Sequence, residues 1–373
     1  MEKQIKILVT GAKGFIGRNL VVELKNRGYT EIFEFDVDTP NDKLEEYTKY
    51  CDFVFHLAGV NRPENDEDFM KGNFGFTSVL LKNLKTNQNK SPIIITSSTQ
   101  AALDNPYGKS KKAGEDLMLS YAKEVGTKVY IYRLTNVFGK WCRPNYNSAV
   151  ATFCNNIANG LPVTVNNRET ELTLCYIDDL VNELINALEG CANKVGDFCE
   201  ISVTHKATLG RIVDLLYSFE NESSSLSVPD VDDDFVKKLH STFLTYLPEE
   251  KIKYSLNSHT DVRGSFTEIF RTQNCGQFSV NVSRQGITKG NHWHHTKNEK
   301  FIVVSGSGVI KLRKINTSKV ITFEVSGEKI EVVNIPAGYT HNITNTGDTD
   351  MVTFMWCNEC YNPEKPDTFY QEV

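Results

Sequence analysis

Long apolar runs are missing from this chain of 373 residues. No stretch approaches the ~20 residues that a membrane-spanning helix needs, and no signal peptide precedes the first apolar run, which begins at Ile5. A basic surplus is missing as well, because 41 Lys and Arg residues face 47 Asp and Glu residues, a net charge of −6. These absences predict a cytoplasmic protein whose main partner is neither a nucleic acid nor a membrane.

The cysteines lack the pattern of a disulfide framework. There are nine of them, an odd number scattered along the chain, which favours free thiols in a reducing compartment. Cys357 and Cys360 form a CxxC pair, but no second pair accompanies it, so a zinc or redox role there is not favoured. No internal repeat of solenoid period is visible.

What is present suits a two-domain globular protein. The length exceeds what one core usually holds, and 40% hydrophobic with 24% charged residues is ordinary for a folded protein. Residues 220–234 are rich in serine and acid and predict a surface loop, followed by a helix over 235–244. Beyond Tyr254, short alternating segments punctuated by glycine predict a sandwich or barrel. We therefore predict domains at 1–247 and 248–373.

The first domain opens with a strand and a glycine turn. Residues 5–10 are an apolar strand, and Gly11, Gly14 and Gly17 lead into a helical pattern that ends at Gly28. Such a turn lets backbone N–H groups approach a pyrophosphate at a helix N-terminus. A second strand follows, so the order of elements predicts a dinucleotide-binding α/β fold.

Two signals disagree about the dinucleotide. Asp36 ends the second strand nineteen residues after Gly17, where an acid accepts hydrogen bonds from the ribose 2′-OH of NAD. Lys13 and Arg18 instead favour a 2′-phosphate. The choice between NAD and NADP stays open at this point.

Two further apolar runs, residues 53–59 and 93–99, predict buried parallel strands. Ligands of such sheets bind at the carboxyl ends of the strands, which places Ala58, Gly59, Ser97 and Ser98 beside the nucleotide.

A possible acid follows the second of these strands. Tyr107 and Lys111 are four residues apart and share one face of a predicted helix. An ammonium beside a phenol lowers the phenol pKa from about 10. The pair could therefore pass a proton to a substrate oxygen.

Together these features resemble the extended short-chain dehydrogenase/reductases that act on nucleotide sugars. The matching features are Gly11-x-x-Gly14-x-x-Gly17, His56-Leu-Ala-Gly59, the Ser97-Ser98 strand end, Tyr107-x-x-x-Lys111 and the segments 133–139 and 176–179. The resemblance implies that Tyr107 donates a proton, that Ser98 holds the substrate carbonyl, and that Lys111 contacts the nicotinamide ribose. If the strand ends one residue later, Thr99 is expected to hold the substrate carbonyl in place of Ser98.

The same resemblance implies binding residues. The expected cofactor contacts are Gly11, Lys13, Gly14, Phe15, Ile16, Gly17, Asp36, Leu57, Ala58, Gly59, Tyr107 and Lys111. The expected substrate contacts are Ser98, Asn136, Lys140, Arg143, Asn145 and Arg168. We expect His56 to be a satisfied interior histidine.

The second domain carries a group of metal-binding residue types. His292 and His294 are two residues apart and point to the same side of a strand. Glu299 follows, and His341 approaches from a distant strand, whereas His295 points the other way. Three imidazoles and one carboxylate suit a divalent zinc, iron or manganese ion, of which we expect zinc.

The spacing resembles the cupin family, which implies a jelly-roll barrel. Gly286-x5-His292-x-His294-x4-Glu299-x6-Gly306 matches the first cupin motif, and Pro336-x-Gly338-x2-His341-x3-Asn345 matches most of the second. The departure is Ile330, which stands where the family has a turn glycine.

A narrower likeness, through residues 261–268, 290–292 and Lys300, is to cupins that epimerise 4-keto sugar nucleotides. It implies that His292 is a proton-abstracting base and that Lys300 stabilises the enolate. One nitrogen cannot hold a metal and take a proton, so the role of His292 stays open. Trp356 stands where those enzymes have a tyrosine acid, which leaves Tyr339 or Tyr361 as its replacement.

The domain order resembles the bifunctional enzymes of capsule biosynthesis. The resemblance implies a UDP-linked 2-acetamido-2,6-dideoxy-4-hexulose, epimerised at C3 in the barrel and then reduced at C4 with NADPH, NADH being the alternative, on the route to UDP-N-acetyl-L-fucosamine. Epimerisation has to come first, because the ketone that acidifies the neighbouring C–H is consumed by reduction. A homodimer is expected from the same likeness.

Three other interpretations stay open. The first domain could be an epimerase or dehydratase that retains NAD, with a barrel that serves dimerisation. The barrel could instead be a non-haem iron oxygenase. A sugar sensor is disfavoured by the intact set of Ser98, Tyr107 and Lys111.

Overall fold

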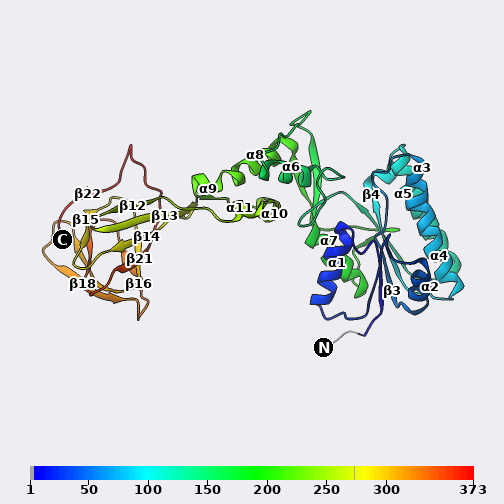
Figure 1. The fold of residues 1–373 in the computed structure, drawn as a ribbon, viewed down its shortest axis with the longest axis horizontal. Helices are drawn as coiled ribbons and strands as arrows, with labels where there is room; N and C mark the ends of the chain where they lie inside the picture. The colour runs from blue at the N-terminus through cyan, green and yellow to red at the C-terminus, as the bar shows by residue number, and fades with distance from the viewer. Residues whose placement is uncertain (1–3, 273) are drawn as a thin grey trace. The chain divides into compact units, whose positions relative to one another are not determined.

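A computed structural model describes residues 4–272 and 274–373. The chain forms two compact units, the first made of Met1–Leu216 and Lys238–Leu247, the second of Tyr217–Lys237 and Pro248–Val373 (Figure 1). The domain division at residue 247 stays a prediction, since residues 217–237 group with the second unit. Among the described residues, no helix has the length and apolar character that crossing a bilayer requires.

The first unit is built around a seven-stranded sheet in the order β2-β1-β3-β4-β5-β9-β8. Neighbouring strands are parallel except for the β8–β9 pair. The strands are β1 Ile7–Thr10, β2 Ile32–Phe35, β3 Phe53–His56, β4 Ile93–Ser98, β5 Val129–Leu134, β8 Lys194–Val195 and β9 Phe198–Cys199. The order reverses between β1 and β3, and a sheet of this kind binds its ligand at the carboxyl ends of those strands.

Helices cover both faces of this sheet because its strands are apolar on both sides. Ile7 and Val9 pack with α1 (Phe15–Asn26) and α7 (Ile177–Leu188). Leu8 packs with the opposite layer, formed by α2 (Asn41–Tyr50), α4 (Phe76–Thr86) and α5 (Pro106–Val125). Figure 1 shows the two layers on either side of the sheet. The predicted doubly wound sheet is confirmed.

A smaller sheet, ordered β10-β7-β6, completes the first unit. Its strands are β6 Asn136–Phe138, β7 Glu171–Tyr176 and β10 His205–Thr208. The remaining helical segments of this region are α3 Glu67–Phe69, the π-helix η1 Met70–Gly75, the 3-10 helix η2 Thr99–Ala102, α6 Ala149–Ala158, α8 Leu209–Glu220 and α10 Asp234–Leu244.

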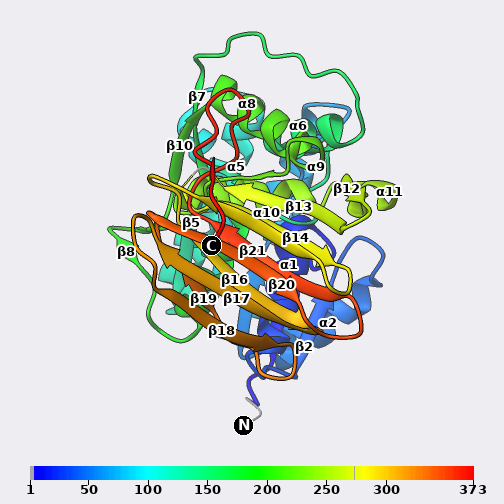
Figure 2. The same ribbon diagram turned by 90° about the vertical axis from the view of Figure 1, so that its left-hand side faces the viewer.

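The second unit consists mainly of two sheets (Figure 2). The first has the order β11-β13-β14-β21-β16-β19, with β12 paired to β13, and the second the order β18-β17-β20-β15-β22. All described pairs are antiparallel except β11–β13. The predicted all-strand second domain is confirmed. The strands are β11 Ser227–Val228, β12 Ser258–Asp261, β13 Gly264–Thr272, β14 Gly276–Ser283, β15 Thr288–Trp293, β16 Glu299–Ser305, β17 Ser307–Lys314, β18 Val320–Ser326, β19 Val333–Ile335, β20 Tyr339–Asn345, β21 Met351–Cys357 and β22 Phe369–Tyr370.

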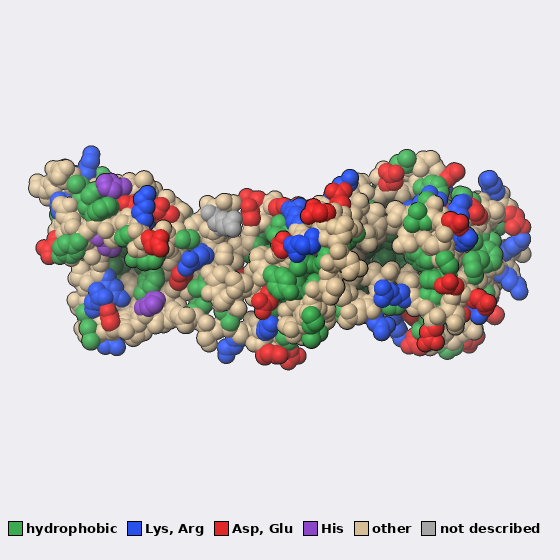
Figure 3. Space-filling view, turned by 90° about the horizontal axis from the view of Figure 1, so that it is seen from above, with side chains coloured by type: hydrophobic (Ala, Val, Ile, Leu, Met, Phe, Trp, Pro, Cys, Tyr) green, Lys and Arg blue, Asp and Glu red, His purple; other side chains and the backbone are tan. Residues whose placement is uncertain are grey.

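Apolar side chains from the facing strands, including Phe301, Ile310 and Ile343, form the core of this unit. Two short helices, α9 (Glu222–Ser225) and α11 (Glu249–Ile252), belong to the same unit. The prediction of a plain surface loop at 220–234 is wrong in part, because this stretch contains α9 and β11. Residues 227–228 form the strand β11 because they pair with β13, where Ser227 lies opposite Arg271. On the face seen in Figure 3, cationic and anionic side chains are interspersed.

Candidate functional site

The glycine turn between β1 and α1 has the shape that a dinucleotide requires. Gly11 has a φ of +71°, and a Cβ there would lie 2.7 Å from the backbone nitrogen of Ala58. A Cβ at Gly17 would lie 2.1 Å from the Gly11 carbonyl oxygen. Neither position accepts a side chain. The helix N-cap, Gly14, provides no side-chain cap, so N–H groups of the first turn, at Phe15 and beyond, can face a phosphate.

The Asp36 carboxylate is engaged by the backbone of this turn. It accepts hydrogen bonds from the amides of Lys13 at 2.7 Å and Val37 at 2.8 Å. The Lys13 ammonium pairs with Asp38 instead, and this hydrogen bond raises the pKa of Lys13. Asp36 therefore orders the turn, while Lys13 presents a cation beside it.

The loop after β3 packs against the glycine turn between β1 and α1. The amide of Leu57 donates to the Thr10 carbonyl at 3.1 Å, and Ala58 lies against Gly11. A Cβ on Gly59 would lie 3.0 Å from the Lys111 ammonium. The structure thus brings these predicted cofactor residues together at the switch point between β1 and β3.

Ser98, Tyr107 and Lys111 converge beside the switch point. Ser98 ends β4, and Tyr107 lies in the first turn of α5, whose N-terminus is capped by Asn105. Ser98 lies close enough to Tyr107 to lower its pKa, and the Lys111 ammonium lies 5.8 Å from the Tyr107 ring centre. That ammonium donates to the Thr96 carbonyl at 3.3 Å.

The electrostatics differ from the expectation for Tyr107. Burial raises the pKa of Tyr107, and the Ser98 hydroxyl beside it offsets this only in part. Burial also lowers the pKa of Lys111 to about 8. The expected net lowering of the Tyr107 pKa is therefore wrong for this arrangement, since burial outweighs the effect of Ser98.

Ser97 and Ser98 face different surroundings because neighbouring strand residues point to opposite faces. The Ser97 hydroxyl donates to Glu115 at 2.6 Å, and Glu115 also accepts two hydrogen bonds from Arg133, at 2.9 and 2.6 Å. Ser97 and Glu115 are both buried. The Ser97 hydroxyl is therefore engaged in the protein interior, its place beside the nucleotide stays a prediction, and Thr99 begins the η2 turn.

We expect the ion pair between Arg133 and Glu115 to stabilise the fold. Arg133→Leu leaves the Glu115 carboxylate buried without its cation, so we expect the free energy of unfolding to fall by about 3 kcal/mol. Chemical denaturation measures the change. Asp116→Asn, in the exposed Lys112–Asp116 pair of the same helix, serves as the control and should cost about 0.5 kcal/mol or less. Equal effects of the two substitutions would contradict the prediction.

His56 is an interior histidine, as predicted. Its two ring nitrogens bond to the hydroxyls of Thr10 and Thr77 at 2.8 and 2.9 Å. Burial lowers its pKa to about 3, so the ring is neutral near pH 7.

The predicted substrate residues lie on loops and strand ends of the first unit. The Arg143 guanidinium lies 5.4 Å from the centre of the Tyr146 ring, and Tyr146 is close enough to influence the Tyr107 pKa. Arg168 is bound by both carboxylate oxygens of Asp214 at 2.7 Å. The other three make local contacts: Asn136 with the Thr173 carbonyl, Asn145 with Thr152, and Lys140 with Asp178. Their contact with a substrate stays a prediction.

The four predicted metal ligands form one cluster in the second unit. One ligand atom from each of His292, His294, Glu299 and His341 lies within 4.8 Å of the others. Pairing between β15 and β20 sets His292 opposite His341, and Glu299 begins β16. The cluster lies on the wall of a cavity of about 640 Å³.

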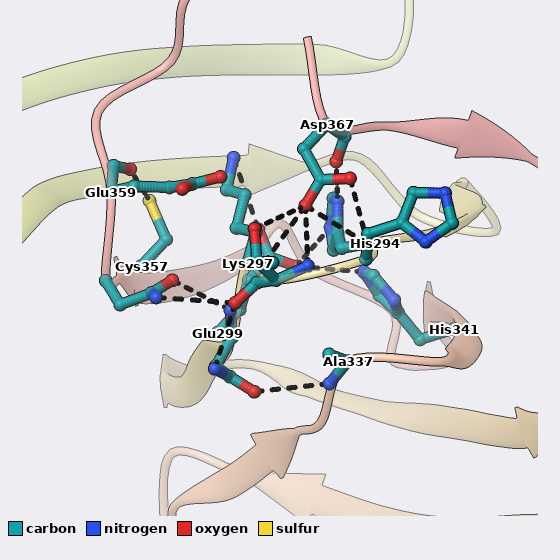
Figure 4. Close-up of polar contacts among 12 residues, drawn as sticks. His294, Lys297, Glu299, Ala337, His341, Cys357, Glu359 and Asp367 are labelled. Carbon is teal, nitrogen blue, oxygen red and sulfur yellow. Dashed lines mark hydrogen bonds and ion pairs between the residues drawn. The ribbon is translucent and has the colours of Figure 1, made fainter.

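The donor set fits a divalent metal. His341 is fully buried, and neither of its ring nitrogens has a hydrogen-bond partner among the described residues, although Nε2 lies 3.1 Å from Glu299. His294 Nδ1 bonds to the Asp367 carbonyl, which leaves Nε2 to face Glu299 at 3.4 Å (Figure 4). An imidazole fixed in this way through its other nitrogen is typical of metal ligands.

The charge of the cluster also favours a cation. Burial raises the pKa of Glu299, but the neighbouring His294 and His341 rings outweigh this effect and leave the pKa well below its usual range. Burial lowers the pKa of His292 to about 4, so this ring is neutral near pH 7. The cluster therefore holds an ionised carboxylate among imidazoles, the arrangement that zinc and related metals bind.

Lys300 is not brought to the cluster. It follows Glu299 on β16, so it points to the opposite face, where its exposed ammonium donates to Asn334 at 2.6 Å. The predicted contact of Lys300 with a substrate at the cluster therefore has no geometric support. Two other lysines line the cavity: Lys289, bonded to Asn281 at 2.6 Å, and Lys297, 4.0 Å from Glu299. Strand alternation was the signal that could have identified the error.

Several neighbouring residues have defined places. Tyr361 lines an adjoining cavity of about 540 Å³, together with Lys297, Glu299 and Trp356. Tyr339 packs against the apolar core, and the His295 ring packs on Trp293 and Phe369, away from the ligands. All nine cysteines are free.

Comparisons with known proteins cover both units. The family model described as NAD dependent epimerase/dehydratase family matches residues 7–201, and that of the polysaccharide biosynthesis C-terminal domain matches residues 259–369. Over 366 residues the chain is 43% identical to the UDP-2-acetamido-2,6-beta-L-arabino-hexul-4-ose reductase of Pseudomonas aeruginosa, with 98% of each chain covered.

Solved structures agree with these matches. The capsular polysaccharide assembling protein CapF from Staphylococcus aureus superposes with a TM-score of 0.94 and 51% identity, covering 99% of this chain and 100% of that one. A structure of CapF with the inhibitor 3-isopropenyl-tropolone has a TM-score of 0.89 and 47% identity, with 99% and 100% covered. The resemblance to enzymes of capsule biosynthesis is confirmed: the chain belongs to the NAD dependent epimerase/dehydratase family and, within it, to the relatives of CapF that carry a polysaccharide biosynthesis C-terminal domain.

Proposed function

We propose that this protein is a bifunctional UDP-sugar enzyme that epimerises a 4-keto sugar at C3 and then reduces the ketone with NADPH. The observation that carries the proposal is the presence, in one chain, of a Ser98–Tyr107–Lys111 group at the switch point of a dinucleotide fold and a separate cluster of metal-ligand type. Each group suits one of the two reactions.

Reduction takes place beside Tyr107. NAD(P)H, when bound at the switch point, would supply a hydride to the carbonyl carbon. Tyr107 donates its phenolic proton to the carbonyl oxygen, which the Ser98 hydroxyl positions. The charge of the Lys111 ammonium, held against the Thr96 carbonyl, stabilises the phenolate that remains.

Epimerisation takes place at the cluster. A divalent metal held by His292, His294, Glu299 and His341 would make the C–H next to the ketone more acidic. The position of His292 within the cluster favours the role of ligand over that of base. Lys297, in the cavity wall beside Glu299, takes the charge-stabilising role predicted for Lys300. Of the two tyrosines considered for returning the proton, Tyr361 faces the adjoining cavity and Tyr339 does not.

The relatives support the substrate class. The Pseudomonas aeruginosa relative is a reductase of a UDP-2-acetamido-2,6-hexul-4-ose, and the Staphylococcus aureus relative is a capsular polysaccharide assembling protein. We propose a UDP-linked 2-acetamido-2,6-dideoxy-4-hexulose as substrate, on the route to UDP-N-acetyl-L-fucosamine, with zinc as the metal and a homodimer as the working form.

One experiment tests both halves. The full-length protein is given the 4-keto UDP-sugar and NADPH in deuterated water, and the product is examined by mass spectrometry and NMR. We expect one deuterium at C3 and stoichiometric loss of nicotinamide absorbance. Deuterium without NADPH consumption would favour an epimerase that retains NAD. Reduction without deuterium at C3 would show that the protein is not an epimerase. Turnover that depends on molecular oxygen would favour the alternative of a non-haem iron oxygenase.

A further inference from the structure

The C-terminal segment contacts the cluster through Asp367. Its carboxylate accepts hydrogen bonds from three successive backbone amides, those of His295 at 2.9 Å, Thr296 at 2.8 Å and Lys297 at 3.1 Å (Figure 4). The Thr296 hydroxyl adds a further bond at 3.2 Å. This turn connects His294 to Glu299, so one carboxylate organises the chain between two of the predicted ligands.

The backbone of the same residue contacts a ligand directly. The Asp367 carbonyl oxygen accepts the hydrogen bond from Nδ1 of His294. A carbonyl can only accept, so Nδ1 carries a proton, and Nε2, which faces Glu299, is the nitrogen left to bind a metal. Asp367 thus sets the tautomer of one ligand and the path of the chain toward another.

The residues after Asp367 strengthen this attachment. β22 pairs with β15, where Tyr370 lies opposite His292, and the Gln371 amide donates to the Asn291 carbonyl at 3.0 Å. The Thr340 hydroxyl, next to His341, donates to the Gln371 carbonyl. The tail is therefore bonded to both strands that carry the other two histidines.

We propose that Asp367 is a positioning residue of the metal site, which holds His294 and Glu299 in place through its carbonyl and its carboxylate. This inference rests on the proposed metal-dependent epimerase. Asp367 does not touch the substrate in this scheme. Groups that orient ligands in this way typically affect metal affinity by about 10- to 100-fold.

The test uses the full-length protein and measures zinc affinity by chelator competition, together with C3 deuterium exchange and NADPH-dependent reduction. For Asp367→Ala we expect zinc affinity to fall about 10- to 100-fold and exchange to fall at low zinc, while excess zinc restores exchange. Reduction of a 4-keto sugar that is already epimerised should be unchanged. Asp367→Asn keeps an acceptor oxygen and should recover most of the affinity.

The matched control is Glu364→Ala, which removes one exposed carboxylate from the same segment and should leave zinc affinity unchanged. Wild-type zinc affinity in Asp367→Ala, with or without lower thermal stability, would overturn the inference and leave the proposed function standing. Absence of zinc binding by the wild type would overturn the metal-dependent epimerase itself and the inference with it.

Discussion

Tyr107→Phe should abolish reduction and spare epimerisation. Without the phenol, the alkoxide formed at C4 has no proton donor, so we expect kcat for NADPH oxidation to fall by about 100-fold or more. The ring itself stays, and with it the packing against Phe69, whose centre lies 5.5 Å away. Stopped-flow or steady-state loss of nicotinamide absorbance measures the change, and NMR in deuterated water should still show exchange at C3.

A matched control lies in the same helix. Tyr121 is buried in α5 and its hydroxyl makes a 3.4 Å contact with the Asn89 carbonyl, within the helical layer. Tyr121→Phe removes the same atom and should leave kcat within about two-fold, because Tyr121 lies roughly 20 Å from Tyr107 along α5. If Tyr107→Phe reduces the ketone at the wild-type rate, the tyrosine is not the acid and the assignment of this site is wrong.

Glu299→Gln should abolish epimerisation and spare reduction, the reverse of what we expect for Tyr107→Phe. The amide is nearly the same size as the carboxylate, but it lacks the charge that draws a cation into a site of imidazoles. We expect zinc affinity to fall by at least about 100-fold, because even groups behind the ligands contribute 10- to 100-fold. Deuterium incorporation at C3 should disappear, whereas reduction of a pre-epimerised ketone should continue at the wild-type rate.

Glu324→Gln supplies the comparison, because Glu324 is an exposed carboxylate on the edge strand β18 of the same unit. It should change neither zinc content nor exchange. Zinc content is measured by atomic emission after dialysis. C3 exchange that persists in Glu299→Gln protein free of metal would show that the cluster is not the epimerase site.

Two expectations gave a family pattern or a general sheet rule more weight than local geometry. The likeness to other cupins assigns Lys300 to the cavity. Successive residues of a strand point to opposite faces, however, so Lys300 lies on the face of β16 that Glu299 does not share. The sheet rule gave Ser97 and Ser98 the same role, although neighbouring strand residues point to opposite faces, and the Ser97 hydroxyl bonds to Glu115.

Other features have no local signal at all. Asp367 follows His294 by 73 residues, and nothing in its own neighbourhood marks it as a partner of the cluster. The net pKa of Tyr107 depends on how deeply folding buries it, and the order of residues 227–228 depends on pairing with β13.

The sequence by itself determined the dinucleotide turn, the alternation of buried strands and helices, and the set of three histidines and one glutamate. These follow from short-range rules: a backbone turn that excludes Cβ atoms at Gly11 and Gly17, and strand periods that put His292 and His294 on one side. Tertiary structure alone decided which serine faces Tyr107, which lysines reach the cavity, and that the C-terminal tail supports the cluster. Those outcomes depend on burial and on contacts between distant strands, and a residue's neighbours in sequence do not specify either one.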